Sequence, residues 1–247
     1  GHAEFTDWST QTQKLFATWR AEVTPRLAGI QQGDKPKVLV ESLAEELLAT
    51  FQNAKLLDAY DIYQHLMDYW AESMQDDVYL IASDGWVDAA KPRLMVEDKD
   101  KKSKDKPDFT LGKQKFKAEL IPPALLIARY FAVEQAAIDK LESEAAAVSQ
   151  AMEELAEEHG GEDGLLAEAK NDKDKLTKAS VAARLKAIGL DRDAVEERKV
   201  LGEYLALADK ELALSAKAKA AQEELTAKVA AKYGKLTEED IKALVVE

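Results

Sequence analysis

The part of the chain that follows Pro123 contains no further proline, and its apolar residues recur with a period of seven. Two such series run together, offset by three positions: Phe131, Ile138, Ala145 and Met152 in one, and Leu141, Val148 and Leu155 in the other. This spacing is the a and d pattern of a coiled coil, in which one apolar stripe faces a second helix. It predicts a helix from about residue 123 to 158, roughly 50 Å long.

The glycines of segment 160–164 should end this helix, and a second long helix is expected from about residue 193 to 233, before Gly234. Between the two, a short helix with Thr177 as its N-cap and Gly189 at its end predicts a small helical tip near 160–190. The pattern as a whole predicts an antiparallel coiled-coil hairpin over 121–235. The facing stripe of the second helix is assigned to Leu201, Leu205, Leu212 and Leu225, with Ala208 in the first register and Leu214, Ala218 and Ala221 in a shifted one.

Residues 1–120 predict a compact helical domain, because three segments carry apolar residues at helical spacing. The first covers about 7–30 and includes Pro25, which is expected to kink or split it. The second covers about 36–53 and starts at Pro36, a residue that suits the first position of a helix. The third runs from 57 to 73 or beyond, and its apolar stripe is rich in aromatic rings, which indicates a real core: Leu56, Tyr60, Tyr63, Met67, Trp70 and Met74.

The segment 78–117 shows only brief signs of extended structure. Residues 78–81 fit either a short strand or the tail of the third helix, and the groups 94–96 and 109–111 fit short extended pieces. Residues 97–107 are almost all Lys, Asp and Glu, which predicts an exposed, mobile loop. The chain is therefore predicted to be mainly α, with few or no short strands near 78–117.

The composition limits the possible functions. The formal net charge is −13, and a phosphate backbone repels so acidic a chain unless its positive charges are gathered in one place. Cysteine is absent, which excludes disulfides, thiol nucleophiles and cysteine-bound metals. No apolar run approaches the roughly 20 residues that cross a bilayer, and no signal-peptide pattern opens the chain. These features predict a cytoplasmic protein.

Both ends of the chain are expected to be cut. No initiator Met precedes Gly1 and His2, which are interpreted as a remnant of cloning. Near the other end, Thr237 and Asp240 have the spacing of a helix cap, and apolar residues flank them on both sides. Residues 236–247 are therefore interpreted as the start of a further, truncated helix.

No catalytic, cofactor-binding or metal-binding residue is assigned. Asp61 and His65 are one helical turn apart and could share a metal ion, but any amphipathic helix shows a polar face opposite its apolar stripe. The segment 160–164 is rich in glycine but follows a helix, whereas a nucleotide-binding loop follows a strand, so it is interpreted as a turn. Ser42 and Ser180 lack the His–acid pair that would activate a nucleophile.

The clearest basic patch lies between residues 97 and 117, which include eight lysines and five acidic residues. Lysines in such a patch can contact the phosphate backbone of DNA, although a solvated loop has the same composition. The candidate DNA-backbone contacts are Lys101, Lys102, Lys104, Lys113, Lys115 and Lys117.

Several strings resemble one protein family. They are residues 57–70 and 74–79, residues 115–123 leading to the Arg-Tyr-Phe of 129–131, and the turn 158–164. Together they resemble the C-terminal region of the modification (methyltransferase) subunit of type I restriction–modification systems. The likeness extends from about residue 19 to the end of the chain.

The resemblance implies a parent protein that methylates adenine N6 in DNA with S-adenosylmethionine. The catalytic signature of the family is Asn-Pro-Pro-aromatic, in which the asparagine holds a flipped adenine and the ring stacks on it. Here Pro122 and Pro123 lie between Ile121 and Ala124, which can do neither. The glycine-rich loop for the methyl donor is also missing. No catalytic residue is carried over, so this chain is expected to be no enzyme and to bind no cofactor.

The resemblance therefore implies an assembly module. In this family two modification subunits assemble on one specificity subunit, and the C-terminal helices are expected to pack against helices of that subunit. The helical domain and the hairpin both qualify as the contact, and DNA is reached only through the assembled complex, with no membrane partner. Three alternatives stay open: auxiliary DNA-backbone contact through the 97–117 lysines, a metal-dependent enzyme built on Asp61 and His65, and a generic coiled-coil scaffold.

Overall fold

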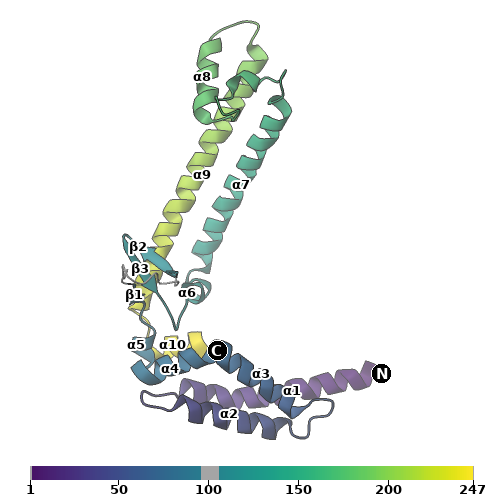
Figure 1. The fold of residues 1–247 in the computed structure, drawn as a ribbon, viewed down its shortest axis with the longest axis vertical. Coiled ribbons are helices and arrows are strands. Elements are labelled where there is room, and N and C mark those ends of the chain that lie inside the picture. Colours follow the sequence, from purple (N-terminus) through teal and green to yellow (C-terminus); the bar gives the residue numbers. More distant parts are fainter. Residues whose placement is uncertain (1, 96–105, 247) are drawn as a thin grey trace. The chain divides into compact units, whose positions relative to one another are not determined.

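The structure, a computed structural model, describes residues 2–95 and 106–246 of the chain, which is mainly α-helical (Figure 1). Two compact units are present: unit 1 comprises Gly1–Tyr130 and Lys228–Glu247, and unit 2 comprises Phe131–Ala227. The expected division fell at residue 120 and set 236–247 apart, whereas the residues from 228 onward belong to unit 1. None of the helices in the described part of the chain combines the length and apolarity that a bilayer crossing requires.

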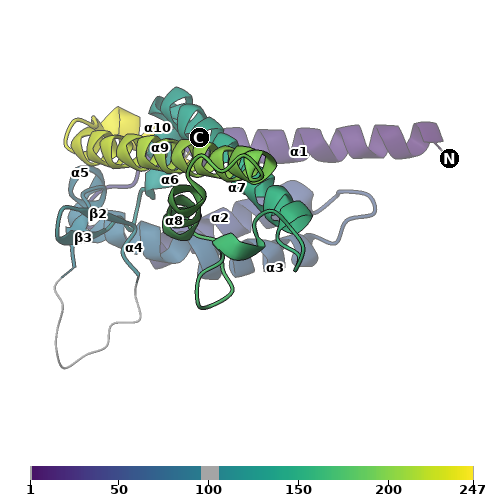
Figure 2. The same cartoon turned by 90° about the horizontal axis from the view of Figure 1, so that it is seen from above.

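Unit 1 begins with the two helices α1 (His2–Ala28) and α2 (Pro36–Phe51). The first is not split at Pro25, because this proline lies in the last turn, where only one main-chain hydrogen bond is lost. The second starts at Pro36, as predicted. The Arg26 guanidinium of α1 donates to Glu46 and Ser42 of α2 and joins the two helices. The first turns of α1 extend beyond α2 and α3 in both views (Figure 2).

A single helical run follows, formed by α3 (Ala59–Tyr69), a π-helical turn η1 (Trp70–Met74) and α4 (Gln75–Asp84). Residues 78–81 lie within α4, so they are the tail of the helix and not a strand. Gly85 ends the run with a φ of 78°, a backbone conformation that glycine adopts without strain. The short helix α5 (Trp86–Ala89) comes next, and its buried Trp86 indole donates to the Ile30 carbonyl at 2.7 Å.

A small antiparallel sheet follows, made of β1 (Arg93–Leu94), β2 (Phe109–Leu111) and β3 (Gln114–Lys117) in the order β1-β3-β2. The strand β3 was not expected, because its sequence Gln-Lys-Phe-Lys contains only one apolar residue. Phe109 stacks on Phe116 across the sheet and on Tyr233 near the end of α9, with ring centroids 5.2 and 6.0 Å apart. The sheet therefore packs against the C-terminal part of the chain.

The helices α6 (Pro123–Tyr130) and α10 (Glu238–Val246) complete unit 1. The start of α10 has the predicted cap: the main-chain N–H of Asp240 donates to the Thr237 hydroxyl, and that of Thr237 donates to the Asp240 carboxylate, both at 3.1 Å. Leu236 and Ile241, which flank this cap, are buried. Tyr130 donates from its hydroxyl to Asp240 at 3.1 Å, which links α6 to α10.

Unit 2 contains α7 (Ala132–His159), a 3-10 turn η2 (Ala167–Ala169), α8 (Lys178–Ile188) and most of α9 (Val195–Tyr233), whose last turns belong to unit 1. The single helix expected over 123–158 is wrong, because the backbone breaks at Phe131, with φ −133° and ψ 23°, between α6 and α7. No Gly or Pro lies between residues 124 and 159 to mark this break. The hydroxyl of Tyr130, the last residue of α6, donates to Asp240 of α10, and this hydrogen bond holds α6 against α10.

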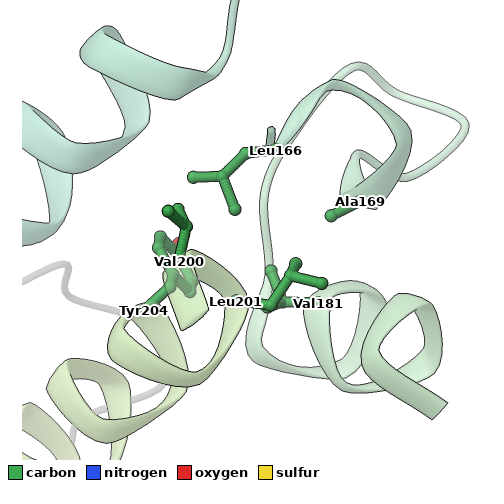
Figure 3. Packing of buried hydrophobic residues seen from close by; sticks show 6 residues of the cluster. All are labelled: Leu166, Ala169, Val181, Val200, Leu201 and Tyr204. Atoms are coloured by element: carbon green, nitrogen blue, oxygen red, sulfur yellow. The ribbon is translucent and has the colours of Figure 1, made fainter. Parts of the chain in front are cut away.

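The region between α7 and α9 has a small core of its own. The Thr177 hydroxyl accepts from the Ser180 main chain at 3.1 Å, and the Thr177 N–H donates to the Ser180 hydroxyl, so the predicted N-cap of α8 is confirmed. Figure 3 shows the buried side chains of this core: Leu166 and Ala169 from the segment before α8 and Val181 of α8 pack against Val200, Leu201 and Tyr204 of α9.

Candidate functional site

The heptad-spaced residues of α7 differ in burial. Ile138, Ala145 and Val148 are buried, and the other four assigned residues are half-buried: Phe131, which immediately precedes α7, and Leu141, Met152 and Leu155. Ala145 and Val148 form one cluster with Leu214 of α9. Nearer the connecting segment, Met152 and Leu155 pack on the cluster that contains Val200 and Leu201 of α9. The predicted stripe of α7 therefore packs on α9 within unit 2.

The assignment on α9 needs one correction. Leu201 and Leu225 are buried and Leu205 is half-buried, but Leu212 is 58 % exposed and lies outside the buried face. Leu214, two residues further on and assigned to the shifted register, is buried and packs with Ala145 and Val148 of α7. Sequence reasoning also missed two residues of the same face, Val200 and Tyr204, which are both buried. Because this face is covered within unit 2, few of its apolar residues are available to another molecule.

Only three of the six candidate DNA-contacting lysines, Lys113, Lys115 and Lys117, belong to the part of the chain that the structure describes. Lys101, Lys102 and Lys104 lie outside the described residues. Of the lysines of β3 and the turn before it, Lys117 forms an ion pair with Asp108 at 2.9 Å. Asp108 also accepts from the Ala118 main chain at 2.7 Å, so this ion pair is part of the sheet's own structure. Lys113 and Lys115 are exposed.

Unit 1 contains a cavity of about 520 Å³ with mainly apolar walls. One wall is α1 and the other is formed by α3, η1 and α4, with Leu43 and Leu47 of α2 between them and Val245 and Val246 of α10 also in the lining. We call this cavity the α1–α3 groove. It follows α1 from Phe16 to Leu27, a distance of about 16 Å at about 1.5 Å per residue. The apolar residues on its two helical walls include Phe16, Val23, Leu27, Ile62, Leu66 and Tyr69.

The α3 wall of the groove is incompletely covered. No residue of α3 is buried, although the helix is strongly amphipathic, and Tyr69, which lines the groove, is 59 % exposed. The predicted core stripe is therefore only partly covered. Trp70 is buried, Tyr63, Met67 and Met74 are half-buried, and Leu56 and Tyr60, which lie outside the groove lining, are exposed. An amphipathic helix with an uncovered apolar face is typical of an interaction surface.

One polar atom in the groove lacks a hydrogen-bond partner. The indole N–H of Trp19 is buried and finds no acceptor among the described residues. By contrast, the indole of Trp8 donates to the Lys55 carbonyl at 2.6 Å and that of Trp86 to the Ile30 carbonyl at 2.7 Å. A buried donor without an acceptor costs about 1–3 kcal/mol, so native structures rarely keep one without a reason. Sequence reasoning placed Trp19 in an apolar repeat, and no local pattern marks its N–H as unpaired.

Acidic groups lie along the α3 side of the groove. Asp77 of α4 lines the cavity, and burial, together with the nearby charge of Asp76, raises its pKa to about 6. Asp61 and Asp68 of α3 and Glu72 of η1 are exposed, and their spacing of seven and four residues places them on one side of the helical run. His65, one turn from Asp61 and from Asp68, lines the groove, so this acidic edge adjoins it.

No group of three or more His, Cys, Asp or Glu side chains in the described part of the chain could hold a metal ion. Asp61 and His65 are placed along the groove edge instead. The groove can bind apolar side chains of another molecule, and Trp19 and Asp77 are polar groups in its lining that can orient them.

No protein-family model, curated protein or solved structure matches this chain.

Proposed function

We propose that this chain is an assembly module: the C-terminal part of the modification subunit of a type I restriction–modification system, which holds the methyltransferase on its specificity subunit. The strings quoted from residues 57–79 and 115–131 motivate the family assignment. In this proposal the chain is itself no enzyme and binds no cofactor. The adenine-N6 methylation with S-adenosylmethionine belongs to the parent protein.

The observation that carries the proposal is the partly uncovered apolar face of α3 beside the α1–α3 groove, where Ile62 and Leu66 are half-buried and Tyr69 is exposed. A surface helix of a compact domain normally covers its apolar stripe, yet no residue of α3 is buried. The groove leaves about 520 Å³ unfilled between α1 and α3. Protein interiors are packed nearly as densely as organic crystals, so a gap of this size between α1 and the amphipathic helix α3 favours an absent third element.

We assign to unit 2 a supporting role as an antiparallel coiled-coil hairpin. This arrangement is favoured by the cluster of Ala145, Val148 and Leu214, and by Met152 packing close to Leu201. Residues late in α7 thus pack with residues early in α9, as an antiparallel pair requires. Because the two helices cover each other's apolar stripes, the hairpin offers less apolar surface than the groove, and we place the main contact on unit 1.

Binding to the specificity subunit encoded with the parent protein tests the proposal. We expect the chain to co-elute with that subunit at micromolar concentration and Tyr69→Glu, on the exposed wall of the groove, to weaken binding at least tenfold. Leu212→Glu introduces the same charge at a similarly exposed apolar residue of unit 2 and should leave binding unchanged. A loss of binding in Leu212→Glu alone would move the contact to the hairpin. Failure of the wild-type chain to bind would overturn the proposal.

A further inference from the structure

The α1–α3 groove has the shape of a site for a helix and not of a pocket for a small molecule. Two helices form its long walls, and it extends for about three helical turns along α1. Tyr69 of α3, which lines the groove, is 59 % exposed, so the apolar wall reaches the molecular surface. A small ligand would cover only part of a wall of this length, whereas an amphipathic helix can cover it with residues one turn apart.

The charges beside the groove indicate the charge of the occupant. Asp61, Asp68 and Glu72 form an exposed acidic edge on the α3 side, in a chain whose net charge is −13. The α1 wall differs, because its charged lining residue is Arg20. A helix that lies in the groove is therefore best matched if Lys or Arg residues follow the edge that faces α3.

The polar groups inside the groove restrict the buried residues of the occupant. The Trp19 N–H needs an acceptor, which the described part of the chain does not provide. A carboxylate is a poor candidate for that acceptor, because Asp77 lines the same cavity and the acidic edge adjoins it. A side-chain amide or hydroxyl can accept from the indole without adding negative charge.

We propose that the α1–α3 groove binds one amphipathic helix of the partner subunit, with a basic edge facing Asp61, Asp68 and Glu72 and a buried amide or hydroxyl that accepts from the Trp19 indole N–H. The inference rests on the proposed function, because the helix is assigned to the specificity subunit. A single polar contact in an apolar groove would fix the register of the bound helix, as a buried polar residue does in a coiled coil.

The Trp19 N–H can be observed directly in the wild-type chain. The chain contains four tryptophans, so indole ¹⁵N labelling gives a spectrum of few signals, assigned by Trp→Phe replacement. On addition of the specificity subunit, we expect the Trp19 indole proton to move downfield as it gains an acceptor, and its exchange with solvent to slow. The signal of Trp8, whose N–H is already bonded to Lys55, should move little.

Affinity measurements separate the indole from the ring. Trp19→Phe keeps an aromatic ring but removes the N–H, and we expect it to raise the Kd for the specificity subunit about tenfold. Trp8→Phe removes an indole N–H outside the groove lining and should change the Kd less than twofold. The wild-type spectrum still decides the matter if Trp19→Phe does not fold.

A second pair of variants tests the acidic edge at equal net charge. The double variant Asp61→Lys/Asp68→Lys should raise the Kd about tenfold and reduce its dependence on salt. Glu41→Lys/Glu45→Lys makes the same change in charge on exposed positions of α2 that do not line the groove, and should have less than a threefold effect.

The outcomes distinguish this inference from the proposed function. A complex that forms with an unmoved Trp19 signal and an unchanged Kd in Trp19→Phe would overturn the inference and leave the assembly function intact. No complex at all would overturn both. The dye 1-anilinonaphthalene-8-sulfonate serves as a small apolar probe: if it shifts the Trp19 signal and the specificity subunit does not displace it, the groove is a small-molecule site and the inference fails.

Discussion

The hydroxyl of Tyr233 donates a hydrogen bond of 2.5 Å to the main-chain carbonyl oxygen of Ile121, although 112 residues separate them in the sequence. Both residues are buried, and burial raises the pKa of the Tyr233 hydroxyl well above its usual value. The bond ties the last turn of α9 to the segment that precedes α6, and Phe109 stacks on the same ring. One side chain thus joins three separate parts of unit 1.

The first prediction follows from this bond. Tyr233→Phe keeps the ring stacking but leaves the Ile121 carbonyl buried without its donor, so we expect a loss of about 1–3 kcal/mol in the free energy of unfolding. Urea denaturation at pH 7 measures it. Tyr130→Phe, which removes a more exposed hydroxyl from Asp240, should cost less than about 1 kcal/mol. An equal loss of unfolding free energy in both variants would show that the buried hydrogen bond to Ile121 contributes no more than the more exposed one to Asp240.

The second prediction concerns two leucines that lie two residues apart in α9. Leu214→Ala removes a side chain that is 8 % exposed and packed on α7, and should lower the free energy of unfolding by about 2–3 kcal/mol. Leu212→Ala makes the same chemical change at a residue that is 58 % exposed, and should cost less than about 0.5 kcal/mol. Thermal and urea denaturation of the two variants measure the difference. A greater loss of unfolding free energy in Leu212→Ala than in Leu214→Ala would show that Leu212, as assigned from the sequence, packs on α7.

These two leucines also show why the stripe of α9 was only partly predictable. An α-helix has about 3.6 residues per turn and a heptad repeat implies 3.5, so a long apolar stripe drifts around the helix. Leu205, Leu207, Leu212 and Leu214 offer two registers that are equally apolar. The register is decided by which leucines pack on Ala145 and Val148 of α7. This is a tertiary contact, so the local sequence of α9 does not predict it.

Local chemistry made other parts of the fold predictable. Pro36 starts α2, Thr177 and Thr237 cap α8 and α10, and Gly234 follows the last residue of α9, as expected. Each of these features needs only residues within one helical turn. The break at Phe131 and the strand β3 depend on tertiary contacts, which explains why no local pattern revealed them. The groove was unpredictable for the same reason, since it depends on what α3 leaves uncovered.

The third prediction concerns Leu56, whose φ is 62°, in the left-handed region that a leucine adopts only at a cost of roughly 1–2 kcal/mol. Its side chain is 87 % exposed and contributes little packing within the chain. Leu56→Gly removes the strain but increases the entropy of the unfolded chain, so we expect a net gain of about 0.5–1 kcal/mol in stability. The melting temperature of the variant measures this gain.

The control for Leu56→Gly is a second exposed leucine. Leu190 is 93 % exposed and does not have a positive φ, so Leu190→Gly offers no relief of strain. It should leave stability unchanged or reduce it slightly. A similar gain in both variants would mean that the loss of an exposed apolar side chain, and not the backbone conformation, causes the effect.

The fourth prediction uses the pH dependence of stability. Burial raises the pKa of Asp77 from 3.8 to about 6, so the folded chain binds this proton more tightly than the unfolded chain does. The contribution of protonated Asp77 to the free energy of unfolding is therefore fully present below about pH 4, and it is lost as the pH rises through about 6. Asp77→Asn cannot ionise, and at pH 7.5 it should be more stable than the wild type. Because Asp77 is only half-buried, solvent screening limits the gain to about 1 kcal/mol.

Urea denaturation of Asp77→Asn and the wild type between pH 4 and 8 measures this effect. The difference in unfolding free energy should be largest above pH 7 and shrink toward zero near pH 4, where Asp77 is protonated and uncharged in the wild type. Asp76→Asn provides a graded control, since the charge of Asp76 is the second cause of the raised pKa. Removing that charge should move the midpoint of the Asp77 transition toward lower pH without abolishing it. A difference between Asp77→Asn and the wild type that stays constant over this range would show that Asp77 is not held in a desolvated site, and the polar interior assigned to the groove would then reduce to the Trp19 N–H.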